Sequence, residues 1–375
     1  MSVPTHTAVE IVSGWVEAGV VPGAALLVSR GDDVVVERYW GKADRRRNVI
    51  ASADTLWSIA SITKPVTAAA LMACVDRGLL SVDAPLHEVV PEFARRDVTL
   101  RHLVTHTSGL AGFSRDNLAL RKRHAPIDDF ISSFFEEEVH FEPGRWHLYS
   151  SVGLGLVAEC IGRKLAQGQR SMAAYEKFTL QLLRDLGATD FVFRPDDAQQ
   201  ERIAWVEDTG QEGLDWEIGN SRYFRSLGFP WGGLYMRARD VLTFISSFLP
   251  GHETSALSRE ARAAMIKEQV APPDAPADIA PNQRDVTWDP NAPLRPAVPW
   301  GLGWQVKGAA PNDFMGSLAH PSAFGHYGAS GTAAWADPER GLAAVLLTNR
   351  AWQSWWPVQE GRTARLADAI VTELG

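Results

Sequence analysis

Hydrophobic residues near the N-terminus predict one helix followed by a β-hairpin. Apolar side chains recur at helical spacing between Val9 and Val16, as they do on the buried face of a helix. A short apolar run follows at 24–29 and a β-branched and aromatic run at 34–40, and the turn residues at 31–33 separate them. Short apolar runs on either side of such a turn are typical of two paired strands.

Helical spacing then dominates from about residue 81 to residue 227. Residues 127–135 predict one helix, and residues 171–186 predict another, which Ser171 caps and Gly187 ends. Strand patterns return near the C-terminus, at 304–306, 332–335 and 342–347. A last helix carries apolar residues on one face, namely Leu366, Ile370 and Leu374.

The order of these elements predicts an α/β (α+β) protein in two parts. Residues 1–80 and 228–375 supply the strands and form a discontinuous α/β domain, and residues 81–227 form a mainly helical domain inserted between them. Between 268 and 300 the chain is irregular and rich in proline. This predicts a long surface excursion, and long ordered loops in enzymes often border the site. Whether the excursion is a lid stays open.

The composition is that of a globular protein. The 375 residues are 45% hydrophobic and 22% charged, which allows two domains or one large domain with ample core. The net charge of -8, with no basic block, argues against nucleic acid as a partner. No apolar stretch of membrane-spanning length occurs, so no membrane partner is expected. The short arginine cluster at 45–47 is interpreted as a solvated turn.

Cys74 and Cys160 lie in apolar helical contexts and are expected to be buried. Neither has the spacing of metal ligands, and the chain has no His-Glu-x-x-His motif, so no metal or other cofactor is expected. The N-terminus lacks the basic start and apolar run of a signal peptide. This predicts the cytoplasm, although a periplasmic protein whose leader had been removed would have the same sequence. The oligomeric state stays open.

The tetrad at 61–64 is the strongest candidate for chemistry, and it is the only Ser-x-x-Lys in the chain. Positions three apart share one helix face, so the Ser61 hydroxyl can lie beside the Lys64 amine. Serine becomes a nucleophile when a neighbouring base takes its proton, and lysine can do so only when it is neutral. Pro65 fits only the first turn of a helix, which places Ser61 at a helix N-terminus. Taken alone, the tetrad also fits a capped, solvent-facing helix start.

Two further segments carry candidate chemistry. Tyr149 precedes an apolar helical stretch, and a tyrosine whose pKa is lowered by cationic neighbours can relay a proton. His326 opens a glycine-rich segment at the entrance to a strand, where Gly328 would let a substrate approach the backbone closely. A backbone N–H just beyond that glycine could supply half of an oxyanion hole. A packed tyrosine and a turn with a structural histidine are the alternatives.

A fourth segment, at 103–110, contains His106 among threonines and a serine. This histidine could be taken for the base of a Ser-His pair. The favoured interpretation is structural: a helix end whose hydroxyls and imidazole bind free backbone carbonyls.

Together and in this order, the segments resemble the serine β-lactamase-like superfamily, most closely the class C β-lactamase-related branch of esterases, D-aminopeptidases and DD-peptidases. Its motifs run Ser-x-x-Lys, Tyr-x-Asn, then Lys-Thr-Gly or His-x-Gly. The corresponding residues here are Ser61 and Lys64, Tyr149-Ser150-Ser151, and His326-Tyr327-Gly328. The resemblance covers roughly residues 8 to 350. It implies an antiparallel β-sheet flanked by helices, with a helical domain beside it and the site between them.

The resemblance also implies roles for individual residues. Ser61 would be the acylated nucleophile and Lys64 its basic neighbour, while Tyr149 would act as general base or proton relay. His326 would help to position the substrate and tune Tyr149. The oxyanion hole would consist of the N–H groups of Ser61 and Ala329.

Two departures from the family pattern bear on the substrate. Ser151 stands where the family's β-lactamases carry Asn, and a serine cannot present both an amide N–H and a carbonyl. His326 and Tyr327 replace a Lys-Thr pair that recognises a substrate carboxylate. A neutral histidine attracts an anion less than lysine does, and Tyr327 adds bulk. Both changes argue against strong β-lactamase activity and suit the family's esterases.

The leading hypothesis is therefore a serine carboxylesterase that acts on short- to medium-chain esters through a Ser61 acyl-enzyme, with acyl transfer by the same residues. Amide chemistry, as a β-lactamase or a D-amino-acid peptidase, is the alternative, and a non-catalytic scaffold is a third. The chain lacks the Gly-x-Ser-x-Gly elbow of an α/β-hydrolase.

The fourteen tryptophans are a high number for this length. Several lie in loop-like or terminal contexts, namely Trp288, Trp300, Trp352, Trp355 and Trp356. They either line an apolar acyl or alcohol pocket or pack in the core, since tryptophan is often partly buried in any fold.

Overall fold

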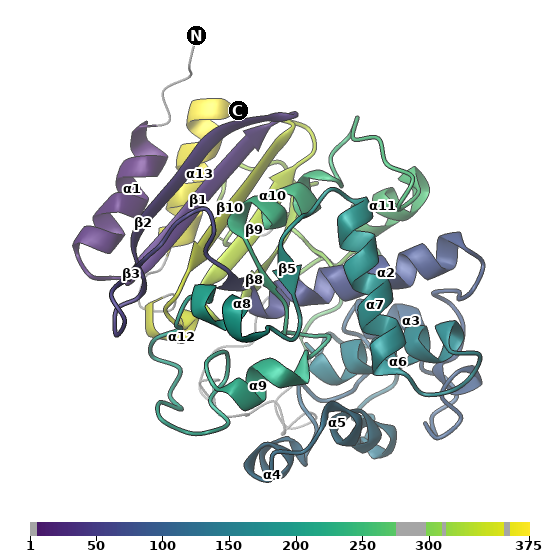
Figure 1. The fold of residues 1–375 in the computed structure, drawn as a ribbon. Helices are drawn as coiled ribbons and strands as arrows, with labels where there is room; N and C mark the ends of the chain where they lie inside the picture. Colours follow the sequence, from purple (N-terminus) through teal and green to yellow (C-terminus); the bar gives the residue numbers. More distant parts are fainter. Residues whose placement is uncertain (1–5, 275–297, 310–312, 356–360) are drawn as a thin grey trace.

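The computed structural model describes residues 6–274, 298–309, 313–355 and 361–375 (Figure 1). Its main sheet contains the strands β1 (Gly23–Arg30), β2 (Asp33–Asp44), β3 (Val49–Ile50), β7 (Gln305–Val306), β8 (Phe324–Gly328), β9 (Thr332–Asp337) and β10 (Leu342–Thr348). They lie in the order β3-β2-β1-β10-β9-β8-β7, and every pair is antiparallel. The predicted antiparallel sheet, built from both ends of the chain, is confirmed.

The two faces of this sheet are covered by different helices. Side chains alternate between faces along a strand, so Leu26 joins the core beneath α1 (His6–Glu17) and α13 (Arg362–Leu374). Its neighbour Leu27 joins the larger core on the opposite face, beneath α10 (Ala238–Ser246). Figure 1 shows α1 and α13 together on one side of the sheet.

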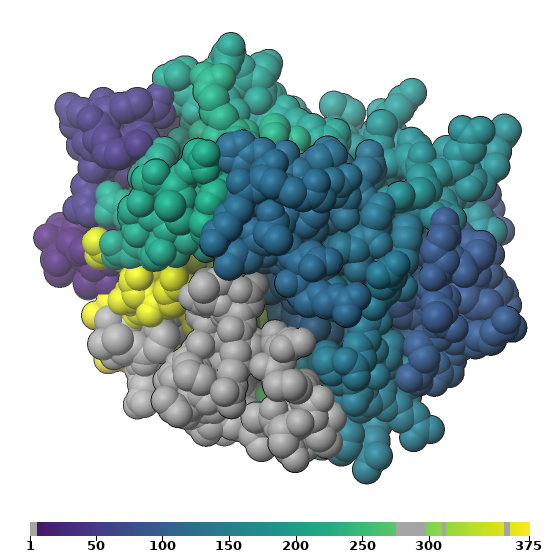
Figure 2. Space-filling view, turned by 90° about the horizontal axis from the view of Figure 1, so that it is seen from below, coloured from purple at the N-terminus to yellow at the C-terminus, as the bar shows by residue number. Residues whose placement is uncertain are grey.

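The other helices come from the chain between β3 and β7, except for α12, which follows β10. They are α2 (Thr63–Asp76), α3 (Leu100–Val104), α4 (Asn117–Lys122), α5 (Ile127–Ser133), α6 (Ser151–Leu165), α7 (Met172–Asp185), α8 (Asp197–Arg202), α9 (Arg222–Leu227), α11 (Arg259–Ile266) and α12 (Trp352–Trp355). A small second sheet has the strands β4 (Trp57–Ser58), β6 (Tyr235–Met236) and β5 (Phe191–Val192), in that order. In Figure 2 the N-terminal and C-terminal colours share one side of the visible face, and the middle of the chain covers the other.

Helix α2 is the element through which the site is positioned. All but its last two residues are buried, and it packs against α6, α7 and α11. A helix surrounded on every side cannot rotate without disturbing several neighbours, so its first turn is rigidly placed. The division into domains of residues 1–80, 81–227 and 228–375 stays a prediction.

Local predictions from the sequence pattern are mostly confirmed. The hairpin of β1 and β2 turns at 31–32, and Ser171 caps α7 by accepting the Ala174 N–H. Both cysteines are buried, in α2 and α6, and burial raises the pKa of Cys74 to about 11. Among the described residues, no helix is long and apolar enough to cross a membrane.

The proline-rich segment falls largely outside the described residues, since 275–297 is not among them. Its two flanks are joined by the pairing of Val270 with Trp300, and the first flank also pairs with His147 through Asp274. Trp288 and Trp356, which the sequence placed in loop-like or terminal contexts, also lie outside the described residues.

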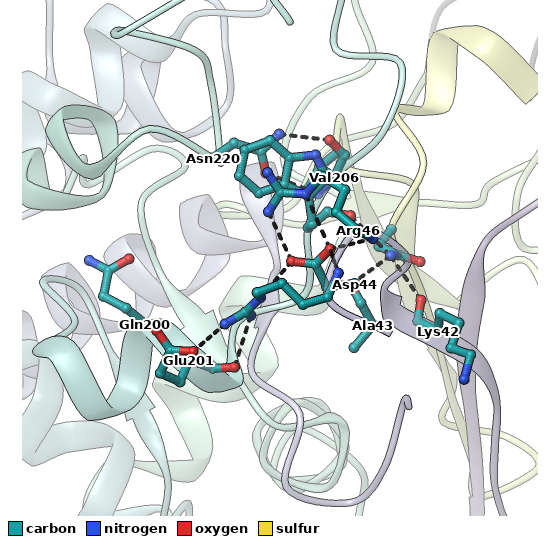
Figure 3. A network of polar contacts seen from close by, with 12 residues as sticks. Lys42, Ala43, Asp44, Arg46, Gln200, Glu201, Val206 and Asn220 are labelled. Carbon is teal, nitrogen blue, oxygen red and sulfur yellow. Dashed lines mark hydrogen bonds and ion pairs between the residues drawn. The ribbon is translucent and has the colours of Figure 1, made fainter. Parts of the chain in front are cut away.

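The arginines at 45–47 form a turn, as predicted, but they are ion-paired rather than only solvated. Asp44, which is 1% exposed, accepts hydrogen bonds from Arg46 at 2.8 Å and from Arg47 at 2.8 Å (Figure 3). Arg47 also pairs with Glu201, and Arg45 pairs with Glu207. We call these six residues the arginine clasp. The clasp ties the β2–β3 hairpin to the chain around 200–207.

Candidate active site

Ser61 lies in a 3₁₀ turn (Ala60–Ile62) that leads directly into α2. Ala60 has a φ of 45°, which is unusual for a residue with a Cβ and is typical of strained backbone at functional sites. The turn is held from the β8–β9 side, because the Ser330 hydroxyl donates to the Ser58 carbonyl at 2.5 Å. The predicted place of Ser61, at the start of a helix, is confirmed.

Gly328 lies at the end of β8, and the turn after it leads into β9 at Thr332, so the predicted place of the segment at the entrance to a strand is confirmed. A Cβ on Gly328 would lie 2.5 Å from the Ile59 carbonyl oxygen and 2.5 Å from Thr332 Oγ1. The chain's own nucleophile turn, not only a substrate, therefore approaches this glycine. The absence of a side chain lets β8 pack against the residues that carry Ser61.

The Lys64 amine is placed to act on Ser61. Its Nζ donates to Ser61 Oγ at 3.0 Å and to the Trp231 carbonyl at 3.0 Å. Lys64 is 1% exposed, and this burial lowers its pKa to about 7. Among the described residues, no carboxylate pairs with the amine. Burial therefore favours the neutral amine near pH 7, and a neutral amine can take the hydroxyl proton.

Tyr149 lies beside both Lys64 and His326. Its hydroxyl is 3.3 Å from His326 Nε2, and Lys64 Nζ is 4.6 Å from the centre of the tyrosine ring. His326 Nδ1 is 2.7 Å from the Tyr327 carbonyl oxygen, which can only accept, so Nδ1 carries a proton. Burial lowers the pKa of His326 to about 3, so the ring is neutral and Nε2 has a lone pair. The Tyr149 hydroxyl therefore donates to His326.

The structure thus brings four of the predicted site residues together. Ser61, Lys64, Tyr149 and His326 form one continuous series of contacts. They come from the start of α2, the segment before α6 and the end of β8. The i,i+3 spacing of the first two is local, whereas the other contacts depend on how α6 and β8 pack.

The remaining predicted residues lie around this group. Ser151 is the first residue of α6 and is buried, and its N–H donates to the Gly112 carbonyl. The Tyr327 ring packs against Phe314 and Trp352. Ala329 is exposed in the turn after β8. The roles of Ser151, Tyr327 and Ala329 toward a substrate, and the oxyanion hole, stay predictions.

The expectation for the segment around His106 is confirmed for a hydroxyl, since Thr105 Oγ1 donates to the Arg101 carbonyl at the end of α3, but it is wrong for the imidazole. The His106 imidazole does not bind a carbonyl; Nδ1 accepts the N–H of Ser150 at 3.1 Å.

Trp300 also belongs to this surrounding, since its ring lies 4.7 Å from that of His106 and 6.1 Å from that of Tyr149. The sequence pattern also did not predict that the Trp231 backbone carbonyl accepts a hydrogen bond from Lys64.

A recess of about 60 Å³ lies beside the nucleophile turn. Ala60, the residue before Ser61, lines it together with Gly232 and Ala329. Its other walls are partly apolar, and they include Val206, Ile218, Phe224 and Ala351. A small recess with apolar walls beside a nucleophile suits a short hydrocarbon group.

Comparisons with known proteins give matches along most of the chain. A family model described as Beta-lactamase matches residues 9–355. Esterase EstB of Burkholderia gladioli is 28% identical, over 93% of this chain and 90% of its own. Penicillin-binding protein 4 of Amycolatopsis lactamdurans is 28% identical, over 88% of this chain and 81% of its own. A solved family VIII carboxylesterase has the same fold, with a TM-score of 0.77, 21% identity, and coverage of 99% of this chain and 98% of its own.

Proposed function

Because the chain belongs to the Beta-lactamase family, we propose that it is a serine carboxylesterase acting on short- to medium-chain esters. One observation carries the choice of substrate. By the family resemblance, His326 stands where other members carry a lysine that recognises a substrate carboxylate, and burial lowers the pKa of this imidazole to about 3, so it is neutral. A site without a fixed positive charge there favours an uncharged ester over a carboxylate-bearing β-lactam.

In the proposed reaction, neutral Lys64 takes the Ser61 proton as Oγ attacks the ester carbonyl. The oxyanion is held by the N–H groups of Ser61 and Ala329. The ester C–O bond then breaks, and Tyr149 passes a proton to the departing alcohol oxygen. Tyr149 regains its proton from protonated Lys64, which is thereby neutral again. Water then loses a proton to Lys64 and attacks the acyl carbon, and that proton returns to Ser61 Oγ as the acid is released. Another alcohol in place of water would give acyl transfer.

The relatives and the recess support the ester assignment. Esterase EstB aligns along nearly the whole chain, and the small apolar recess beside Ala60 favours short acyl groups. Penicillin-binding protein 4 aligns almost as far, so amide hydrolysis is the second candidate. The intact contacts between Ser61, Lys64 and Tyr149 argue against a scaffold that has lost its chemistry.

The test is parallel turnover of p-nitrophenyl esters, from acetate to octanoate, and of a chromogenic cephalosporin. Wild type and Ser61→Ala are compared. We expect ester turnover that favours the shorter chains and is abolished in the variant, with little cephalosporin hydrolysis. Cephalosporin turnover above ester turnover would move the assignment to amide chemistry. Turnover of neither substrate, with no fluorophosphonate adduct on Ser61, would overturn the assignment as a serine hydrolase.

A further inference from the structure

We propose that His106 is a positioning residue that holds Tyr149 in place for acyl transfer. The proposal rests on the proposed function, since it gives His106 a task only if Tyr149 handles a proton there. His106 follows α3 and is 1% exposed, and the reaction described above does not use it. Its contacts are concentrated on Tyr149 and on the two residues that flank it.

His106 binds the backbone on both sides of Tyr149. The His106 carbonyl accepts the N–H of Leu148 at 2.8 Å. Its Nδ1 accepts the N–H of Ser150 at 3.1 Å. The residues immediately before and after Tyr149 are thus held by one residue from a distant part of the chain. Two hydrogen bonds that bracket a residue fix its Cα position and the direction of its side chain.

The imidazole also limits the movement of the tyrosine ring. The rings of His106 and Tyr149 have centres 4.4 Å apart and planes inclined by 41°. On its other sides the imidazole meets Trp300 at 4.7 Å and His147 at 5.8 Å, both nearly edge-on. His106 is therefore wedged between three rings. Tyr149 cannot tilt toward it unless Trp300 or His147 also moves.

The neutral state of His106 is part of this arrangement. Burial lowers the pKa of His106 well below its ordinary value, and the nearby His147 and Lys64 lower it further. Because Nδ1 accepts an N–H, the lone pair lies on Nδ1 and the ring proton on Nε2. A protonated imidazole would lose the bond to Ser150 and would add a second positive charge near Lys64.

The backbone of His106 adopts a conformation that favours glycine. Its φ of 57° lies in the left-handed region, which is unfavourable for residues with a Cβ. A glycine would adopt this conformation with less strain, but it would offer neither the Nδ1 acceptor nor the ring. Strained backbone persists when the surrounding contacts over-determine it, and such strain is found mainly at functional sites.

Small shifts of Tyr149 would matter for the reaction. Its hydroxyl is 3.3 Å from His326 Nε2, and its ring lies beneath Lys64 Nζ at 4.6 Å. A displacement of about 1 Å of a reacting group can cost about 10²-fold in rate. Loss of the His106 contacts is therefore expected to act on kcat rather than on substrate affinity.

Three substitutions separate the acceptor from the bulk of His106. His106→Asn places an amide oxygen where Nδ1 lies and tolerates the left-handed conformation. His106→Gln has a similar amide but carries it one bond further out. His106→Leu has no acceptor. With p-nitrophenyl butyrate, we expect Leu and Gln to lower kcat by about 10²-fold with KM within about threefold, and Asn to stay within about tenfold of wild type.

Active sites are titrated with a fluorophosphonate, so kcat refers to folded enzyme only. If His106→Leu does not fold, the pair His106→Asn and His106→Gln still decides the matter. Equal kcat values for Asn and Gln would overturn the role of the Nδ1 acceptor. A substitution that lowers only the fraction of active sites titrated, with kcat unchanged, would show that His106 serves folding alone. This result would also overturn the proposal.

A double-substitution cycle tests whether His106 acts through Tyr149. In a Tyr149→Phe background we expect His106→Gln to cost less than about threefold more, since residues that act as a unit are not additive. A full repeat of the loss would overturn the proposal. If Tyr149→Phe alone leaves kcat unchanged, the proton role of Tyr149 fails. If Tyr149→Phe is slow but the His106 variants match wild type, only the positioning role fails.

Discussion

The active site and the arginine clasp are two buried polar regions that differ in the charge of the groups beside their ionisable side chains. In the active site, Lys64 and His326 are buried among uncharged groups, and desolvation lowers the pKa of Lys64 to about 7 and that of His326 to about 3. In the arginine clasp, burial alone would raise the pKa of Asp44. Hydrogen bonds from Arg46 and Arg47 outweigh it and lower that pKa to about 2.

The difference shows that burial makes the charged form of an ionisable group unfavourable unless a partner of opposite charge lies beside it. The partner therefore determines whether the buried group is charged. The clasp supplies guanidinium groups, so its carboxylate stays charged and joins two segments of the chain. In the active site, the hydrogen-bond partners of Lys64 are the Trp231 carbonyl and the Ser61 hydroxyl. Both are uncharged, so neither offsets a positive charge on the amine. A buried amine without a counter-charge can act as a general base. A buried carboxylate paired with two cations instead forms a structural ion pair.

Removal of the neutral base should have the largest effect. Lys64→Arg keeps a cation that cannot lose its proton, and Lys64→Gln keeps a polar group of similar length without basicity. We expect both to lower kcat/KM for p-nitrophenyl butyrate by about 10³-fold, because general base catalysis is typically worth 10²–10⁴. If Lys64→Arg stays within about tenfold of wild type, a positive charge rather than a base is what Ser61 requires.

Tyr149→Phe should have the next largest effect. The ring and its packing against His106 remain, so only the hydroxyl that contacts His326 is lost. We expect kcat to fall by about 10²-fold with little change in KM. Tyr39→Phe serves as the control, since that hydroxyl binds Glu37 on the same strand, β2, and takes no part in the contacts of the active site. A loss below about tenfold at Tyr149 would contradict its role as a proton relay.

Activity should also depend on pH through Lys64. The reaction needs the neutral amine, whose pKa is about 7. We expect kcat/KM to rise about tenfold per pH unit below pH 7 and to level off above it. His326 does not titrate in this range, since its pKa is about 3. If kcat/KM instead rises only near pH 10, Lys64 is charged in the working enzyme. Hydrolysis without enzyme is subtracted at each pH.

The sequence predicted what depends on neighbouring residues. Ser61 and Lys64 are three positions apart at a helix start, and their contact follows from helix geometry. The hairpin, the capped α7 and the buried cysteines follow from local patterns in the same way. The resemblance to a family, rather than any local rule, linked Tyr149 and His326 to them.

What could not be predicted depends on which distant segments meet. The substrate approach expected at Gly328 stays a prediction, whereas the packing of the Ile59 carbonyl against this glycine was not expected. His106 was expected to bind carbonyls, yet the N–H of Ser150 is its partner. The arginines of the clasp find Glu201 and Glu207 only because β2 lies beside that part of the chain. A pattern of residue types carries no record of such pairings.

The smallest expected effect is on stability alone, and it tests the other half of the comparison. Asp44→Asn removes the buried charge that Arg46 and Arg47 share. Since both arginines are partly exposed, we expect a loss of about 1–2 kcal/mol and a melting temperature lower by a few degrees. Turnover of p-nitrophenyl acetate should be unchanged. Asp97→Asn is the matched control, because its pair with Arg95 is half-exposed and should cost less than about 0.5 kcal/mol.

The pH dependence of this effect follows from the lowered pKa of Asp44. A carboxyl group whose folded pKa is about 2, against an ordinary value of 3.8, stabilises the fold above pH 3.8. The unfolded chain binds the proton first as pH falls, so this stabilisation is lost between 3.8 and 2. The melting difference between wild type and Asp44→Asn should therefore be full at pH 7 and shrink below pH 4. Equal melting shifts for Asp44→Asn and Asp97→Asn would mean that burial adds nothing to the clasp, and the contrast between the two regions would then rest on the active site alone.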